Sequence, residues 1–456
     1  MNNAEVSKLS YLYKFLTPEI QFAIKQATIS RLKEKLHCGY ERFNKGEFEC
    51  LIASFIVMMC APQPNMKSYF GSTEFFSYPF IQEMFSNYDI KTYLSCLSFY
   101  ERTVKDDEDS EEESNSEQES EDEILSEPDE NSQIEDTTIN FLPVKGPKIV
   151  DETKPSSITA QLVNEFLLTV DKLFIRHMPD FTIISMDESL IPCKCKCCHK
   201  VYMPQKPHKY GTLVRCACCA RTGYCVSLFL HQSNIKYTCE GIFQRLIENL
   251  PNKIYKMISD NYYSTTKSIN FLVNARISYV GTIRSNRIVD QQKNMELNVG
   301  QCRQIPKNIH HPNFFITVYQ ATKSKKVYFA HTNNYMLPQK EQCWLDINCS
   351  KPQVVQYYNY YTRGVDHMDQ MIEKVRWKHR TTRWPVKVFF HCLGIMLHNA
   401  FVLWTLETKS KITFVHFCLD SGKNNLIPGF FGQVLWGFAY LADTYLCDFQ
   451  YFFNIL

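Results

Sequence analysis

The segment FTIISMDESLIPCKCKCCHK, residues 181–200, marks the change from a helical to a strand-rich pattern in this chain. An apolar run ends in Asp187, and four cysteines and a histidine follow it. Carboxylates bind hard divalent cations, whereas thiolates and imidazoles bind zinc. The segment therefore offers two kinds of metal site side by side, and the rest of the chain must decide between them.

Strand-like segments continue after residue 181 and predict an α/β core. They are FTIISMD, TLVRCACCA, YCVSLFLHQ and KIYKMISD, and the helical EGIFQRLIENL precedes the last of them. Residues 277–355 are β-rich and polar, with a hairpin predicted from NFFITVYQ to VYFAHT. Helices are predicted at 364–377 and 385–404, where Trp384-Pro385 marks a helix start.

The region before residue 181 is predicted to be helical, with one interruption. EFECLIASFIVMM has apolar residues at helical spacing, and residues 156–178 follow a serine N-cap with a long amphipathic pattern. Between them, residues 106–136 hold 17 of the 48 acidic residues and no Lys or Arg. Such a tract cannot bury enough apolar surface to fold, so we expect a disordered loop within a helical region.

The charge outside this tract points to a polyanionic partner. The remaining 31 acidic residues face 50 basic ones, which gives a net charge of +19. A surface of this charge favours nucleic acid, although scattered basic residues on an ordinary surface would give the same sum.

Nineteen cysteines would suggest disulfides in a short secreted chain, but the start MNNAEVSKLSYLYKF lacks the regions of a signal peptide. We therefore expect a reduced, intracellular protein. The tail 426–456 is aromatic, but Gln433, Asp443 and Asp448 interrupt any long apolar run. No membrane span is predicted there.

Four aspartates are arranged in a way that suits catalysis. Asp187 and Asp260 are each predicted at the C-terminal end of a strand, where open α/β sheets bind ligands. Asp366 and Asp369 lie three apart at a predicted helix start. Converging carboxylates would hold Mg²⁺ or Mn²⁺, and two such ions would suit in-line phosphoryl transfer. Taken singly, an Asp after a strand is more often a turn former or a helix cap.

The chain resembles the piggyBac family of transposases and their host-derived relatives. The resemblance rests on an ordered set of motifs over about residues 15–405. They are LTPEI, EFECLIASFIVMM, MKSYFGSTEFFSYPFIQEMFS, SMDESLIP, VYMPQKPHKYG, RTGY, ISDNYYST, YVGTIRSNR, YYNYYTRGVDHMDQM and TTRWPVKVFFHCLGIMLHNAFVLW.

The resemblance implies an α/β fold with a ribonuclease H-like catalytic core, an inserted domain and a helical N-terminal region. It also implies catalytic, metal-binding Asp187, Asp260 and Asp366, with Asp369 as a further aspartate near the site. Family members cut double-stranded DNA at transposon ends and join the freed 3′-hydroxyl to a TTAA target through a hairpin intermediate. The expectations that follow are a two-metal Mg²⁺ or Mn²⁺ site, a homodimer and a nuclear location.

Basic residues near the aspartates are predicted to bind DNA phosphates, with a solvated helix face as the alternative. They are Arg284, Arg287, Lys374, Arg376, Lys378, Arg380, Arg383 and Lys387.

The cysteine-rich segments could together supply a tetrahedral zinc site, but C-x-C is a poorer clip than C-x₂-C. Their possible ligands are Cys193, Cys195, Cys198, His199, Cys216, Cys218 and Cys219. Cysteine is also a small buried hydrophobe, so we interpret these residues as core substitutions and expect no zinc.

Two departures from the family put activity in question. The chain has Cys193, Lys194, Cys195 and Lys196 where relatives carry an apolar residue, Lys, Gly and Arg, and only Cys418 and Cys447 follow Trp404, without the terminal cysteine-rich zinc domain. The alternatives are a catalytically impaired DNA-binding or chromatin protein and a zinc-dependent interaction module. The predicted domains are helical residues 1–105, an acidic loop 106–145, helical residues 146–180, core 181–276, insertion 277–355, core 356–405 and an atypical aromatic tail 406–456.

Overall fold

The structure, a computed structural model, describes most of the chain between residues 8 and 424. The described residues are 8–36, 45–71, 78–100, 150–152, 158–195, 197, 199–251, 253, 255–289, 293–306, 314–332, 351–381 and 383–424. The predicted acidic loop and the tail after residue 424 lie outside them.

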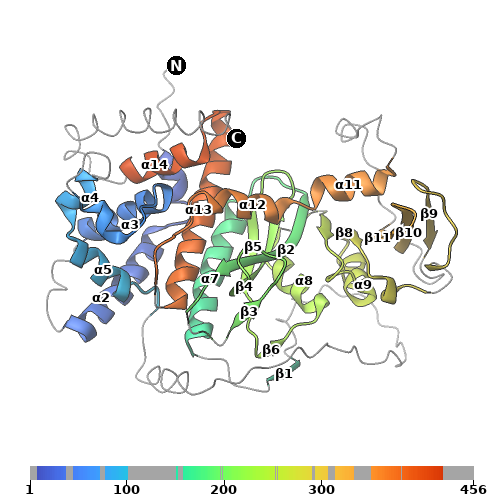
Figure 1. Ribbon diagram of the computed structural model, residues 1–456, viewed down its shortest axis with the longest axis horizontal. Coiled ribbons are helices and arrows are strands. Elements are labelled where there is room, and N and C mark those ends of the chain that lie inside the picture. The colour runs from blue at the N-terminus through green and yellow to red at the C-terminus, as the bar shows by residue number, and fades with distance from the viewer. Residues whose placement is uncertain are drawn as a thin grey trace.

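One long mixed sheet runs through the molecule (Figure 1). Its strand order is β3-β4-β2-β7-β8-β11-β10-β9, and β5 also pairs with β4. The strands are β2 Ile183–Pro192, β3 Lys200–Tyr202, β4 Tyr210–Cys219, β5 Cys225–Leu230, β7 Lys256–Ser259, β8 Ser278–Thr282, β9 Cys302–Pro306, β10 Phe314–Gln320 and β11 Lys326–Thr332. A second sheet pairs β1 Val150–Glu152 with β6 Ile235–Lys236.

The pairing directions confirm the predicted ribonuclease H-like α/β core. Strand β4 is antiparallel to both β5 and β2, whereas β7 is parallel to β2 and β8 is parallel to β7. Parallel neighbours need crossover helices, and α8 Cys239–Ile247 and α9 Thr266–Asn274 supply them. This half of the sheet therefore combines the antiparallel strands β5, β4 and β2 with the parallel strands β7 and β8.

The predicted hairpin in the β-rich segment is confirmed. Strands β10 and β11 pair antiparallel from Phe314↔Thr332 to Gln320↔Lys326, and β9 pairs with the other edge of β10. Strand β11 also pairs with β8, so this hairpin continues the core sheet. The range predicted for the insertion, 277–355, thus includes β8, a strand of the parallel core.

Helices from both ends of the chain pack into one apolar core (Figure 1). Besides α8 and α9, the described helices are α1 Lys8–Leu12, α2 Pro18–Leu36, α3 Lys45–Cys60, α4 Pro79–Met84, α5 Asn87–Cys96, α7 Ile158–Arg176, α11 Gln353–Tyr361, α12 Gly364–Glu373, α13 Trp384–Thr408 and α14 Phe414–Asn424, with 3₁₀ turns at Met66–Tyr69 and Ser285–Arg287. Of these, α11 packs in a separate apolar cluster with residues of β2, β7, β8 and β11. The tail predicted as atypical from residue 406 begins with the last three residues of α13 and continues into α14, whose Phe417 and Cys418 are fully buried.

Helix α13 organises this core. Among the described residues it is long and apolar enough to cross a membrane, but 78% of its most apolar 18-residue window is buried inside the protein. Its Phe389 and Phe390 pack against Phe99, from the N-terminal region, and Trp377 respectively. This burial is typical of a central helix that joins the N-terminal helices to the sheet.

Candidate active site

Asp187 and Asp260 lie on neighbouring parallel strands. The register pairs Met186 of β2 with Ser259, the last residue of β7. Asp187 and Asp260 are the residues that follow this pair. One prediction is corrected: Asp187 is not at a strand end, because β2 continues to Pro192. Its continued pairing with β4 holds β2 extended after β7 has stopped. Asp187 thus lies at the end of the parallel pair but in the middle of its own strand.

Helix α12 lies across the face of β2 that carries Asp187. Ser185 Oγ donates to the Thr362 carbonyl at 2.6 Å, and Ser189 Oγ donates to Asp369 Oδ1 at 2.6 Å. Because side chains alternate along a strand, Asp187 shares the face of these two serines. Asp366 lies between Thr362 and Asp369 on the facing segment. The structure therefore brings the helix carrying Asp366 and Asp369 over the strand carrying Asp187.

The close approach of α12 depends on Gly364. A Cβ atom at this position would lie 2.9 Å from Ser185 Cβ, 3.0 Å from the Cys219 carbonyl oxygen and 3.1 Å from Ala220 Cα. Two of these atoms belong to backbone, so a side chain would push the helix away from the sheet.

Three aspartates of this region, Asp187, Asp260 and Asp369, have pKa values above that of a free aspartate. Burial is the main cause of the raised pKa of Asp187, and the neighbouring Glu188 and Asp260 add to it. Burial and the charge of Glu188 raise the pKa of Asp260, and burial raises that of Asp369 to about 6. Like charges held in a partly desolvated place favour a bound proton or a bound cation.

A network on the opposite face of β2 was missed by the sequence reasoning. Glu188 forms a buried ion pair with Arg215 of β4 and accepts a hydrogen bond from Tyr263 Oη at 2.7 Å. Lys206 Nζ donates to the Glu188 carbonyl at 3.0 Å. The available signal was Arg215 itself, a charged residue inside the otherwise apolar strand TLVRCACCA.

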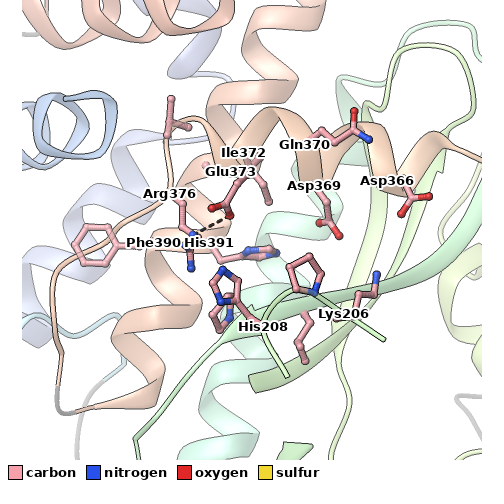
Figure 2. A pocket seen from close by; sticks show the side chains of 15 residues that line it. Lys206, His208, Asp366, Asp369, Gln370, Ile372, Glu373, Arg376, Phe390 and His391 are labelled. Carbon is pink, nitrogen blue, oxygen red and sulfur yellow. Dashed lines mark ion pairs between the residues drawn. The ribbon is translucent and has the colours of Figure 1, made fainter. Parts of the chain in front are cut away.

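A cavity of about 340 Å³ opens beside α12 (Figure 2). Asp366 and Asp369 line it together with Lys206 and His208 from the β3–β4 connection, and Leu190, Pro192 and Phe390 form part of its apolar wall. Asp366 is exposed, and Asp369 is partly exposed. The two helix aspartates can therefore be reached from solvent.

The donor chemistry fits a hard divalent cation, because all four side chains offer carboxylate oxygens under mutual repulsion. Within the part of the chain that the structure describes, no three His, Cys, Asp or Glu side chains are close enough to hold a metal ion. The carboxylates instead form two pairs, Asp187 with Asp260 on the sheet and Asp366 with Asp369 on α12. A site shared by all four carboxylates would need the two pairs to move toward each other.

Comparison with known proteins identifies the family. Residues 150–401, more than half of the chain, match the family described as transposase IS4. The chain belongs to this transposase family.

Among solved structures, the piggyBac transposase synaptic complex with hairpin DNA is similar to this chain. The TM-score is 0.70 at 17% sequence identity, over 94% of this chain and 84% of that chain. At this identity the likeness shows a shared fold. The predicted resemblance to piggyBac transposases and the predicted fold class are confirmed.

The basic residues predicted to bind DNA in this transposase fall into two groups. Arg284, Lys374, Lys378 and Arg380 are exposed, although Arg284 Nε donates to Asn261 Oδ1 at 3.3 Å and Lys374 Nζ to Met371 Sδ at 3.6 Å. The other four are held by partners within the protein. Arg376 pairs with Glu373, and Lys387 Nζ donates to the His379 carbonyl. Arg383 Nη1 donates to the Ser95 and Leu97 carbonyls, and Arg287 Nη1 donates to those of Asn261, Tyr262 and Ser264. Phosphate binding by any of them stays a prediction, and the exposed group suits it best.

The cysteines of the transposase lie mostly inside its core. Cys193, Cys216, Cys218, Cys219 and Cys225 are buried, and Cys195 and Cys197 are partly exposed. Burial raises the pKa of the Cys218 thiol to about 11, so it stays protonated at neutral pH. Cys198 lies outside the described residues. Where they are described, these side chains are placed as small core hydrophobes.

Proposed function

We propose that this transposase cleaves double-stranded DNA at transposon ends and joins the freed 3′-hydroxyl to TTAA target sites. Asp187, Asp260 and Asp366 would hold Mg²⁺ or Mn²⁺, with Asp369 beside them. The observation that carries this proposal is the placement of α12 over β2, because the helix with Asp366 and Asp369 faces the strand with Asp187, and β7, which ends just before Asp260, pairs with that strand.

The bound ions would activate the attacking oxygen and stabilise the leaving oxygen of the phosphodiester. The protein's own residues prepare the site. Burial and neighbouring carboxyl groups raise the pKa values of Asp187 and Asp260, and a bound cation would lower them by stabilising the carboxylate form. Ser189 orients Asp369 through its hydrogen bond. Lys206, at the rim of the cavity, offers a cation for a DNA phosphate.

The partners that we propose are transposon-end and target DNA, bound by a homodimer in the nucleus. Support comes from the charge of +19 outside the acidic tract and from the four exposed basic side chains. The solved relative is a synaptic complex with hairpin DNA, as its description states.

The test is cleavage of duplex DNA carrying TTAA at the junction with a candidate transposon end. With Mg²⁺ or Mn²⁺ the wild-type protein should nick it, and Asp260→Asn should abolish nicking. Asp180→Asn is the matched control, because Asp180 is an exposed carboxylate paired with Lys253. Equal inactivity of wild type and Asp260→Asn, with DNA binding intact, would favour a DNA-binding protein that has lost catalysis.

A further inference from the structure

Asp260 is carried by a turn, residues 260–264, that leaves β7 and no longer pairs with β2. Within this turn the Tyr262 amide donates to Asp260 Oδ1 at 2.9 Å, and Ser264 Oγ donates to the Asp260 carbonyl at 3.1 Å. The direction of the Asp260 carboxylate is therefore set by the backbone of Tyr262. The position of Asp260 relative to Asp187 therefore depends on the contacts that link this turn to β2.

Arg215, Glu188 and Tyr263 form a closed triangle that links the turn to β2. Arg215 Nη1 contacts Glu188 Oε1 and donates to Tyr263 Oη at 2.6 Å, and Tyr263 Oη donates to Glu188 Oε1 at 2.7 Å. The Arg215 guanidinium also lies 4.9 Å from the Tyr262 ring centre and 5.4 Å from that of Tyr263. One buried cation thus contacts β2 and both tyrosines of the turn.

Burying the charges of this triangle carries a desolvation cost that its ion pair need not fully offset. Arg215 is 4% exposed and Tyr263 is fully buried, and they sit beside the apolar core formed by Met186, Phe243 and Ile269. A buried ion pair often stabilises no better than apolar residues of the same volume, whereas it does define one geometry. Glu188 directly follows Asp187, and Tyr263 lies three residues after Asp260. The defined geometry is therefore that of the two sheet aspartates.

We propose that Glu188, Arg215 and Tyr263 are positioning residues that fix Asp260 relative to Asp187. This inference rests on the proposed function in one respect, namely that the two aspartates share a cation. Mg²⁺ demands a nearly ideal octahedral arrangement of ligands, and Mn²⁺ accepts a looser one. The triangle would consequently act on the choice of metal as well as on its affinity.

Tyr263→Phe is the sharpest test, because it keeps the ring and removes the hydroxyl that joins all three groups. Backbone amides of residues 261–264 should exchange hydrogen about tenfold faster in the metal-free variant, as expected for the loss of a buried hydrogen-bond network. Tyr224→Phe is the control: Tyr224 is also fully buried, and its hydroxyl donates to the Phe174 carbonyl at 2.8 Å, in a different core cluster. It should leave exchange at 261–264 unchanged.

The second readout is metal binding, followed by the paramagnetic signal of free Mn²⁺ and by competition with Mg²⁺. Tyr263→Phe should weaken Mg²⁺ binding about tenfold and Mn²⁺ binding about threefold, as expected from the stricter geometry of Mg²⁺. Arg215→Lys, which keeps the charge without the planar fork, should behave similarly. Tyr224→Phe should change neither.

Unchanged amide exchange at 261–264 in Tyr263→Phe would overturn the inference. So would a loss of Mg²⁺ and Mn²⁺ binding in Tyr263→Phe that is no larger than the loss in Tyr224→Phe. If the wild-type protein binds metal but cleaves no DNA, while Tyr263→Phe shows both differences, the proposed function fails and the positioning role stands.

Discussion

Asp187 and Cys216 are direct neighbours in the ladder between β2 and β4, but their surroundings differ. Asp187 is partly exposed and lies beside Asp260 and α12, whereas Cys216 is fully buried and contacts Cys225. Burial raises the pKa of the carboxyl group, whereas the hydrogen bond with Cys225 and then burial raise that of the thiol. Both groups lie near other carboxyl groups, but only Asp187 is partly exposed to solvent. Access from solvent, more than residue type or neighbouring charge, separates the two possible metal chemistries.

The comparison would break if the two neighbours proved equally important for cleavage. Asp187→Asn should lower the nicking rate by about three orders of magnitude or more, since a lost metal ligand removes several kcal/mol of transition-state stabilisation. Cys216→Ala should change the rate by about threefold at most, because it only trims the core. Single-turnover nicking at saturating metal measures both. A Cys216→Ala variant that folds normally and is as inactive as Asp187→Asn would contradict this assignment.

The contact of α12 with the sheet sharpens the same comparison. Gly364→Ala should cost about 2 kcal/mol in the free energy of unfolding, because the new Cβ meets Ser185 and the backbone of residues 219 and 220. Nicking should fall as well, since Asp366 would move away from Asp187. Denaturant unfolding and nicking assays measure these effects.

Gly394→Ala is the matched control for this variant. Its Cβ would meet nothing closer than Ile372 Cβ at 3.5 Å, and alanine favours a helix by about 1 kcal/mol over glycine. Equal losses of stability in the two variants would show that the approach of α12 is not limited by Gly364.

Asp369 makes a prediction that depends on pH. Burial raises its pKa from 3.8 to about 6, so the folded state binds the proton more tightly than the unfolded state does. Its contribution to stability is present below about pH 4 and is lost as the pH rises through about 6. Asp369→Asn removes this dependence and can keep the bond from Ser189, so its stability relative to wild type should rise by about 2 kcal/mol from pH 4 to pH 7.

Denaturant unfolding at several pH values checks this sign. A difference between wild type and Asp369→Asn that stays constant from pH 4 to pH 7 would contradict the raised pKa.

The smallest effect is expected for zinc removal. If the buried cysteines are core hydrophobes, treatment with a zinc-selective chelator should leave the melting temperature unchanged within about 1 °C, because a structural zinc would contribute many kcal/mol to folding. Metal analysis of the purified protein is the companion measurement. One equivalent of tightly bound zinc would instead support the alternative that the protein is a zinc-dependent interaction module.

Local sequence patterns were sufficient for much of the fold. The β10–β11 hairpin, the strand before Asp260 and the helix that starts at Trp384 follow from turn chemistry, apolar runs and a proline at a helix start. The ordered motifs predicted the family, which the match over residues 150–401 confirms. Each of these signals lies within a short stretch of chain, so it can be read without knowing what the stretch packs against.

The tertiary structure decided what each charged residue does. Arg287 and Arg383, predicted to bind DNA, donate to backbone carbonyls of the Asp260 turn and of the N-terminal helical region. Glu188 and Arg215 meet across a strand ladder, and Tyr263 reaches them from a turn 75 residues away from Glu188. Asp187 lies within β2 because β2 stays paired with β4 up to Pro192. The sequence of β2 alone does not reveal this pairing. Such roles depend on contacts between distant segments, and only the packed sheet and its helices bring those segments together.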